Sequence, residues 1–464
     1  MNIIRRGLLL AVVASTAWLA SCANAPDRTT AASSSSSPPI VFVHGNGDTA
    51  ALWTTTLWRF ESNGWLRDRL HAIDVPYPLA RDTDSKPQEG RTSTTEHMQY
   101  LSAEVDKVLQ ATGARQVVLV GNSRGGNAIR NYIANGGGAA KVSHAILGGT
   151  PNHGVRADID NNPGNEFNGA GPFLSGLNQP KGANGDEVTP GVKWMTVRSD
   201  NNDLYAQPDG AFLGAKGKPT NVTFEGPALK GAENVVIAGI DHRETSYSPQ
   251  AFAQAYRFIT GKPPATLAAV PEATVVLDGK VTGRGLNNLQ GNYSTNLPLA
   301  GATVEVFATD AQTGQRRGAA LHRKSVGANG RWGPFTADAQ ARYEFVITAP
   351  GYAVTHVYRS PFPRSSNLVN LRPDRVADAD KDAKALVSLI RPRGYFSVPR
   401  DQISLDGKSP PAGIPAGVAH VATARLKVAD AAGRTVVGEF NGERIAGIAW
   451  PLAENHVVLL ELSQ

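Results

Sequence analysis

One serine lies between glycines in the stretch GNSRGG, from Gly121 to Gly126, and it could act as a nucleophile. A serine hydroxyl needs a histidine to take its proton and a carboxylate to orient that histidine. This residue, Ser123, follows the apolar run QVVLV and precedes the helical pattern NAIRNYIAN. A strand, a Gly-x-Ser-x-Gly turn and a helix together make a nucleophile elbow, which exposes the serine at the sheet edge. We therefore predict that Ser123 is a catalytic nucleophile.

The base should follow Ser123, because proteins with this elbow carry serine, acid and histidine in that order along the chain. His242 comes after the apolar strand pattern ENVVIAGI and before the helical pattern PQAFAQAYRFIT, so it belongs to a strand-to-helix loop on the serine's side of the sheet. We predict that His242 is the base. The other histidines after Ser123 fit this role less well. His144 and His153 would precede an acid from the last strands, and the remaining four lie in the β-rich C-terminal part: His322, His356, His420 and His456.

Two carboxylates end the strand pattern VKWMTVRSDNND and could orient the base. Asp203 directly precedes the apolar Leu204, and we choose it. Asp200 remains the alternative, although its side chain could instead hold the turn through backbone hydrogen bonds. Asp241, adjacent to His242, points away from it along the chain and is expected to be structural.

The loop HGNG after the first strand pattern could supply an oxyanion hole. Its glycines, Gly45 and Gly47, allow a tight fold, so that the backbone N–H of Asn46 would join that of Arg124 at the reacting oxygen. Each such donor changes the rate by roughly 10² to 10³. We expect His44 to hydrogen-bond within the loop.

Six motifs, in order, resemble the bacterial and archaeal lipase/esterase branch of the α/β-hydrolases: VFVHGNGD, VVLVGNSRGG, GGTPNHG, FLSGLN, KWMTVRSDNND and GIDHRE. The resemblance implies ester hydrolysis by Ser123, Asp203 and His242, without a metal or organic cofactor. A β-rich region after FITGKPPAT is similar to the lipid-binding C-terminal part of two-domain archaeal lipases. The lipase elbow usually reads G-H-S-M/Q-G, whereas here Arg124 puts a charge near the acyl site.

Strand and helix patterns alternate from residue 40 to about residue 260, which predicts a mostly parallel sheet with helices on both faces. Ser93 and Glu96 form a capping-box pattern for a helix that ends at Gly113. Its apolar face consists of Met98, Leu101, Val105, Val108 and Leu109. The fold class is thus an α/β hydrolase fold followed by all-β C-terminal modules.

The pattern changes to short strands and glycine turns near Pro263. We predict a catalytic domain over 40–262, a transthyretin-like β-sandwich over 263–372 and a second β-rich module over 373–464.

A long Gly- and Asn-rich segment follows Asn152 and runs to Lys193. Connections of this length are commonly functional or mobile. One interpretation is a substrate cap, and the other is a surface excursion packed on the sheet. The cap would consist of Phe167, Phe173, Leu174 and Leu177.

The first 22 residues have the layout of a secretory signal, with two arginines before an apolar stretch that ends in LASC. LASC resembles a bacterial lipobox, which implies a lipidated Cys22 on an exported, membrane-anchored lipoprotein. An ordinary cleaved signal and a secreted protein are the alternative. Residues 23–39 read as a Ser-rich linker. Cys22 is the sole cysteine, so an intrachain disulfide is excluded.

The net charge of +6 is spread along the chain without a Lys/Arg run, which argues against a nucleic-acid partner. The predicted partners are a lipid or other ester substrate and a membrane. A polyester depolymerase with the same triad is the first alternative, and a peptidase or amidase is disfavoured. The alternative from another class is a non-catalytic surface-binding lipoprotein.

Overall fold

The structure is a computed structural model that describes residues 37–464 except 183, 201, 214–216, 219 and 287–289. Residues 37–464 form one compact unit. The predicted signal peptide with Cys22, and the predicted linker up to residue 36, lie outside the described residues.

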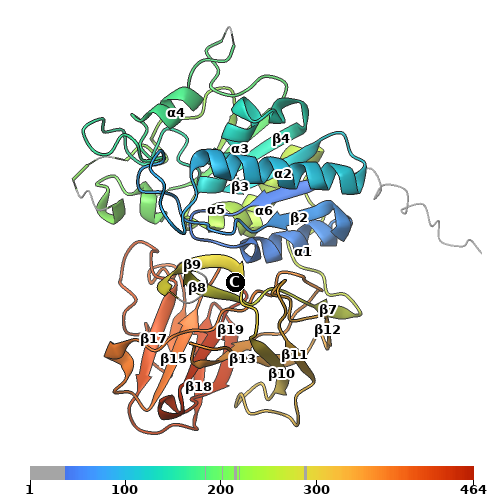
Figure 1. Ribbon diagram of the computed structural model, residues 1–464, viewed down its shortest axis with the longest axis vertical. Coiled ribbons are helices and arrows are strands. Elements are labelled where there is room, and N and C mark those ends of the chain that lie inside the picture. Colours follow the sequence, from blue (N-terminus) through green and yellow to red (C-terminus); the bar gives the residue numbers. More distant parts are fainter. Residues whose placement is uncertain (1–36, 183, 201, 214–216, 219, 287–289) are drawn as a thin grey trace, which may run out of the picture. The chain divides into compact units, whose positions relative to one another are not determined.

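A six-stranded parallel sheet forms the first half of this unit, with the strand order β2-β1-β3-β4-β5-β6 (Figure 1). Chain order reverses at β1, so β1 and β3 are neighbours although β2 lies between them in sequence. In sheets of this kind, ligands bind at the carboxyl ends of the strands where the order reverses. The strands are β1 (Ile40–Val43), β2 (Leu70–Ile73), β3 (Val117–Asn122), β4 (Val142–Gly148), β5 (Lys193–Ser199) and β6 (Glu233–Ile237).

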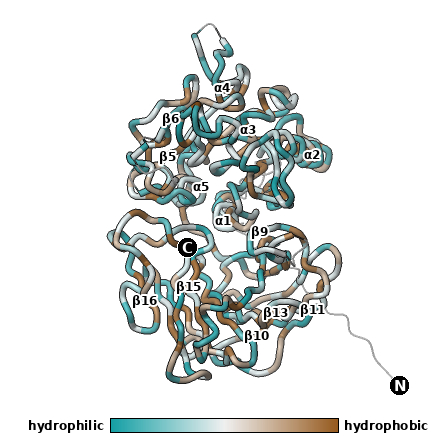
Figure 2. Tube along the Cα trace, turned by 60° about the vertical axis from the view of Figure 1, so that its left-hand side comes forward, coloured by the Kyte–Doolittle hydropathy of each residue, from teal (hydrophilic) through white to brown (hydrophobic). Residues whose placement is uncertain are grey.

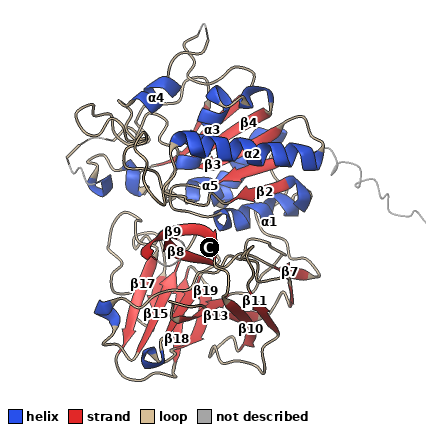
Figure 3. Ribbon diagram, viewed as in Figure 1, coloured by secondary structure: helices blue, strands red, loops and turns tan. Residues whose placement is uncertain are grey.

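Helices cover both faces of the sheet, as Figure 3 shows. Side chains alternate along each strand, so Val41 and Val43 pack on one face with two helices, α2 and α3, while Ile40 and Phe42 pack on the other with α1 and α6. This arrangement confirms the predicted α/β fold class. The helices are α1 (Thr54–Ser62), α2 (Thr94–Thr112), α3 (Arg124–Asn135), α4 (Pro172–Leu177), α5 (Glu244–Tyr247) and α6 (Pro249–Thr260).

Helix α2 begins and ends where the sequence predicts. The Ser93 side chain accepts from the Glu96 backbone N–H, and the Glu96 carboxylate accepts from the Ser93 N–H, so the capping box is confirmed. Gly113 ends the helix with φ 65° in the left-handed region, which glycine adopts without strain.

The C-terminal region is built from strands, which confirms the predicted β-rich character. Its largest sheet has seven strands in the order β11-β10-β13-β14-β20-β15-β17, and hydrophobic stretches are concentrated around β13 and β15 (Figure 2). The strands are β7 (Val275–Leu277), β8 (Thr282–Leu286), β9 (Gln290–Pro298), β10 (Thr303–Thr309), β11 (His322–Ser325), β12 (Phe335–Ala337), β13 (Arg342–Thr348), β14 (Val354–Arg359), β15 (Ala385–Ile390), β16 (Ile403–Leu405), β17 (Thr423–Val428), β18 (Thr435–Phe440), β19 (Glu443–Ile448) and β20 (His456–Glu461).

The predicted division of this region at residue 373 does not separate two sheets. The last strand, β20, pairs in parallel with β14 on one side and with β15 on the other. Its residues Val457 to Leu460 are buried and apolar, so the strand must have neighbours on both edges and both faces. One sheet therefore continues across the predicted boundary.

None of the helices in the described residues is both long and apolar enough to cross a membrane.

Candidate active site

Ser123 lies between β3 and α3 in the strained conformation of a nucleophile elbow. Its φ is 51° and its ψ is −121°, a backbone region that non-glycine residues rarely occupy. The turn is also crowded: a Cβ on Gly125 would lie 2.5 Å from the carbonyl oxygen of Val43, and a Cβ on Gly121 would lie 2.7 Å from Ile129. Glycine is required at Gly125 because β1 approaches α3 so closely, and at Gly121 because β3 approaches the start of α3.

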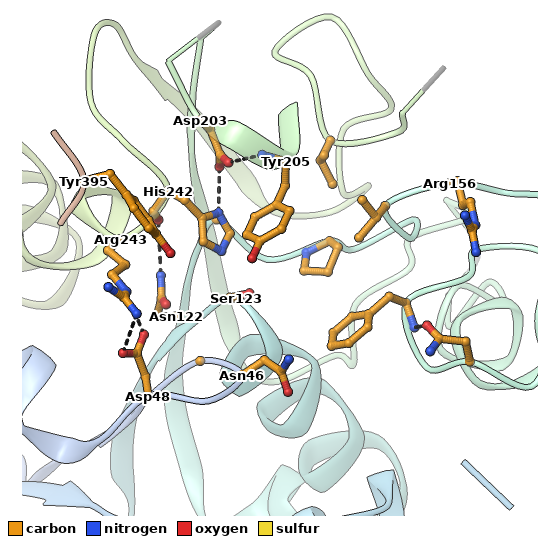
Figure 4. A pocket seen from close by; sticks show the side chains of 17 residues that line it. Asn46, Asp48, Asn122, Ser123, Arg156, Asp203, Tyr205, His242, Arg243 and Tyr395 are labelled. Atoms are coloured by element: carbon orange, nitrogen blue, oxygen red, sulfur yellow. Dashed lines mark hydrogen bonds and ion pairs between the residues drawn. The ribbon is translucent and has the colours of Figure 1, made fainter. Parts of the chain in front are cut away.

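His242 and Asp203 meet beside this turn. The Nδ1 atom of His242 lies 2.8 Å from Oδ2 of Asp203, and both residues are buried. In Figure 4 the His242 ring lies between the Asp203 carboxylate and Ser123. The other Asp203 oxygen accepts from the Tyr205 backbone N–H at 2.8 Å, and the Tyr205 ring packs edge-on against the imidazole. These contacts hold the ring in one orientation.

Asp200, the alternative acid, is engaged elsewhere. Its Oδ1 accepts from the Asn202 backbone N–H and its Oδ2 from the Gly239 backbone N–H. Its carboxylate therefore holds the turn after β5, and the carboxylate bonded to His242 is that of Asp203.

The loop after β1 faces the serine. Gly45 and Asn46 line the same pocket as Ser123, and Asn46 Oδ1 accepts from the Ala80 backbone N–H at 2.7 Å, which fixes the loop. Arg124 is the first residue of α3, and the first N–H groups of a helix have no acceptor within it. The His44 side chain forms a hydrogen bond within this loop, as expected, because its Nδ1 atom lies 2.9 Å from the Gly45 carbonyl oxygen.

The Arg124 side chain, which the sequence placed near the acyl site, is turned away and neutralised. It is 1% exposed and makes two 2.8 Å hydrogen bonds to the Glu166 carboxylate, itself 2% exposed. It also donates to the carbonyl oxygens of Pro78 and Thr92. Burial raises the pKa of Glu166, and the Arg124 charge opposes this shift. The arginine thus ties the elbow helix to the long segment after Asn152.

A pocket of about 340 Å³ contains Ser123, Asp203 and His242. Its wall is mixed in character, with apolar side chains from the long segment and charged side chains near the histidine. The lining residues are Gly45, Asn46, Asp48, Asn122, Ser123, Gly149, Pro151, Val155, Arg156, Asn165, Phe167, Asp203, Tyr205, Val222, His242, Arg243 and Tyr395.

Only Phe167 of the four predicted cap residues lines this pocket. Phe173, Leu174 and Leu177 belong to α4, and Leu174 and Leu177 are buried, at 0% and 3% exposure. The Arg130 side chain of α3 donates to the Leu177 carbonyl oxygen and so fixes α4 against α3. Phe173, Leu174 and Leu177 therefore do not line the pocket that contains Ser123, and their role as a substrate cap stays a prediction.

The sequence did not single out several pocket residues, among them Asp48, Arg243 and Tyr395. Arg243 forms a 3.0 Å ion pair with Asp48 and lies over the Tyr395 ring, 4.9 Å from its centroid. The adjacency of Arg243 to His242 was a usable signal. No sequence pattern places Tyr395, which comes from the C-terminal region, beside the histidine.

In the part of the chain that the structure describes, no group of three or more His, Cys, Asp or Glu side chains is arranged to hold a metal ion.

Comparison with known protein families agrees with this geometry. Residues 38–206 match the family model of the alpha/beta hydrolase fold, and residues 273–376 match the model of the lipase C-terminal domain. The chain is an α/β hydrolase of the lipase and esterase type. The predicted family and enzyme class are thereby confirmed.

Solved structures similar to this chain include two lipases. The mature Bacillus licheniformis lipase BlEst2 is 21% identical, with 48% of this chain and 92% of that chain covered and a TM-score of 0.36. A monoacylglycerol lipase from Paleococcus ferrophilus is 12% identical, with 49% and 97% covered and a TM-score of 0.32.

Proposed function

We propose that this protein is a serine carboxylic-ester hydrolase in which Ser123 is the nucleophile, His242 the base and Asp203 the orienting acid. The observation that carries the proposal is the 2.8 Å contact between His242 Nδ1 and Asp203, made in the pocket that Ser123 lines. A carboxylate on Nδ1 keeps the proton there, so that Nε2 is free to accept the serine proton.

In the proposed reaction, Ser123 Oγ attacks the ester carbonyl carbon while His242 Nε2 takes the hydroxyl proton. The backbone N–H groups of Asn46 and Arg124 stabilise the resulting oxyanion. The tetrahedral intermediate collapses, His242 gives its proton to the departing alcohol, and an acyl-enzyme remains on Ser123. Water then releases the acyl group in a second round of the same steps. His242 takes a proton from the water, and the resulting hydroxide attacks the acyl carbon. The carboxylic acid leaves, and His242 returns the proton to Ser123 Oγ.

The pocket favours short acyl chains. Its volume of about 340 Å³ is near the lower end of the range for small-molecule sites, roughly 300–1,000 Å³. Its purely aliphatic or phenyl side chains are few: Pro151, Val155, Phe167 and Val222.

Hydrolysis of p-nitrophenyl esters from acetate to palmitate tests the proposal. Wild type should hydrolyse the series with a short-chain optimum, and Ser123→Ala should lose at least about 10⁴-fold in kcat, since the triad acts as a unit. Ser175→Ala, an exposed serine on α4, is the matched control and should retain activity. Activity retained in Ser123→Ala would refute the mechanism.

We further propose that residues 1–22 direct export and that Cys22 carries a lipid. Incorporation of labelled palmitate that Cys22→Ala abolishes would support this, and unchanged incorporation would remove it. The same triad could act on a polyester, and release of soluble oligomers from an insoluble polyester film would favour that substrate.

A further inference from the structure

A second cavity, of about 280 Å³, lies between the hydrolase domain and the C-terminal strands. Hydrolase residues from Gly47 to Trp58 line one side, and residues from Thr282 to Ser463 line the other. Both sides belong to the same compact unit of the chain.

The cavity is rich in positive charge. Five arginines line it and only two carboxylates, Asp48 and Glu461, so the lining carries a net formal charge of +3 (five minus two). The arginines are Arg243, Arg284, Arg359, Arg372 and Arg393.

Two of these arginines have no carboxylate partner among the described residues. Arg372 donates to hydroxyl, amide and carbonyl oxygens, including the Thr295 carbonyl oxygen at 2.8 Å. Arg393, 8% exposed, donates to the carbonyl oxygens of Leu462 and Ser463. Buried charges are normally paired. Burial, with Arg284 nearby, lowers the pKa of Arg372 to about 10. An anion in the cavity would relieve this uncompensated charge.

A third arginine has an unused donor at the same place. The Nε atom of Arg359 is buried and has no hydrogen-bond partner in the described part of the chain, although its Nη2 atom contacts Glu461 and the Asn370 carbonyl oxygen. Buried donors without acceptors are uncommon and point to an absent partner. Arginine binds carboxylates with particularly favourable geometry.

The remaining wall of the cavity is apolar. It includes the buried side chains of Leu52, Trp58, Phe362, Leu371 and Leu459. A ligand that satisfies both halves has an anionic head and a hydrocarbon tail.

The cavity also adjoins the active site. Asp48 and Arg243, which form an ion pair with each other, line both the active-site pocket and this cavity. A carboxylic acid formed at Ser123 would be released on the other side of this ion pair.

We propose that the arginine-lined cavity is a second binding site, which takes a fatty carboxylate such as octanoate. The choice of carboxylate rests on the proposed function, because the reaction releases one. The head group lies among the arginines, and the tail lies against the leucine and tryptophan side chains.

Isothermal titration with octanoate, acetate and inorganic phosphate tests the proposal on the full chain. Wild type should bind octanoate more tightly than acetate or phosphate. Arg372→Met and Arg393→Met should each weaken octanoate binding by roughly 10- to 100-fold, the loss of a hydrogen bond to a charged group. Arg323→Met removes a largely exposed arginine on β11 and should bind as wild type does.

Because Arg372 and Arg393 also hold neighbouring segments, a second variant keeps the test decisive. Ala422→Phe leaves all five arginines in place and fills the cavity, so it should abolish octanoate binding. Octanoate binding unchanged in Ala422→Phe would place the ligand elsewhere and overturn the proposal. Equal affinity for phosphate and octanoate would also overturn it, since the tail would then contribute nothing.

The two proposals fail separately. Absence of ester hydrolysis by wild type would refute the proposed function, whereas octanoate binding that depends on the cavity residues would still stand. Hydrolysis without octanoate binding would refute only the second site.

Discussion

The Asp241 carboxylate accepts a 2.7 Å hydrogen bond from Arg391, although 150 residues separate them along the chain. Both side chains are buried. The same Asp241 oxygen accepts from the Tyr395 backbone N–H, and its other oxygen accepts from the Arg243 backbone N–H. A residue adjacent to His242 is thus bonded to the C-terminal region, and this region positions the loop of the proposed base.

Replacing Arg391 should therefore impair catalysis without removing any group from the pocket. Arg391→Met leaves Asp241 without its charged partner, so the His242 loop loses its anchor. We expect kcat to fall roughly 10- to 100-fold with little change in KM, because small misplacements of a catalytic group are costly. Initial-rate assays with p-nitrophenyl butyrate measure kcat and KM.

Two further variants separate this effect from general destabilisation. Arg391→Lys restores a cation and should recover part of kcat. Arg434→Met removes an ion pair with Asp406 in the same region, far along the chain from the histidine contacts, and should leave kcat unchanged. Equal kcat losses in Arg391→Met and Arg434→Met would contradict the positioning role.

The Arg124–Glu166 pair should be a large determinant of stability. Arg124→Met leaves a buried carboxylate without its partner, and breaking such a pair costs about 3–5 kcal/mol. The double variant Arg124→Met/Glu166→Leu removes both charges and should recover much of that loss. Urea unfolding followed by tryptophan fluorescence gives the free energies. A double variant no more stable than Arg124→Met would show that the charge pair is not the cause.

The sequence predicted what depends on local pattern. The elbow at Ser123, the capping box at Ser93 and the strands of the first sheet all follow from short-range spacing and alternation. The proximity of His242 to Asp203 could be inferred because the carboxyl ends of parallel strands meet at one edge of the sheet.

What the sequence could not predict depends on long-range packing. The direction of the Arg124 side chain is decided by Glu166, whose position depends on a long irregular segment. The same holds for Tyr395, which follows β15 in the C-terminal region and lines the pocket, with its backbone N–H bonded to Asp241. No local pattern encodes either contact.

Phe167, and not Phe173 on α4, should control acyl-chain preference. Phe167 lines the pocket, whereas Phe173 does not. Phe167→Ala enlarges the acyl side and should shift the optimum toward longer esters, with a several-fold gain in relative kcat/KM for the longer chains. Phe173→Ala is the matched control and should keep the wild-type profile. A p-nitrophenyl ester series measures both, and identical profiles for the two variants would exclude Phe167 from the acyl site.

His97 should make the fold sensitive to mild acid. It is 3% exposed on α2, and burial, with the Arg124 charge nearby, holds its pKa well below the usual range. In the unfolded chain the imidazole titrates near about 6.5. Below that pH the unfolded state binds a proton that the folded state does not, so the contribution of His97 to stability is present above about pH 6.5 and is lost as the pH falls.

The measurement is the free energy of unfolding in urea at pH 7.5, 6.5, 5.5 and 5.0. A single histidine of this kind changes the slope by up to about 1.4 kcal/mol per pH unit. His97→Leu should flatten the decline between pH 6.5 and 5.0 by up to this amount. Leu101→Ala, on the same helix, should lower stability equally at every pH and leave the slope unchanged. The wild-type slope in His97→Leu would assign the acid sensitivity to other groups, of which the buried His44 is the first to test because burial also lowers its pKa.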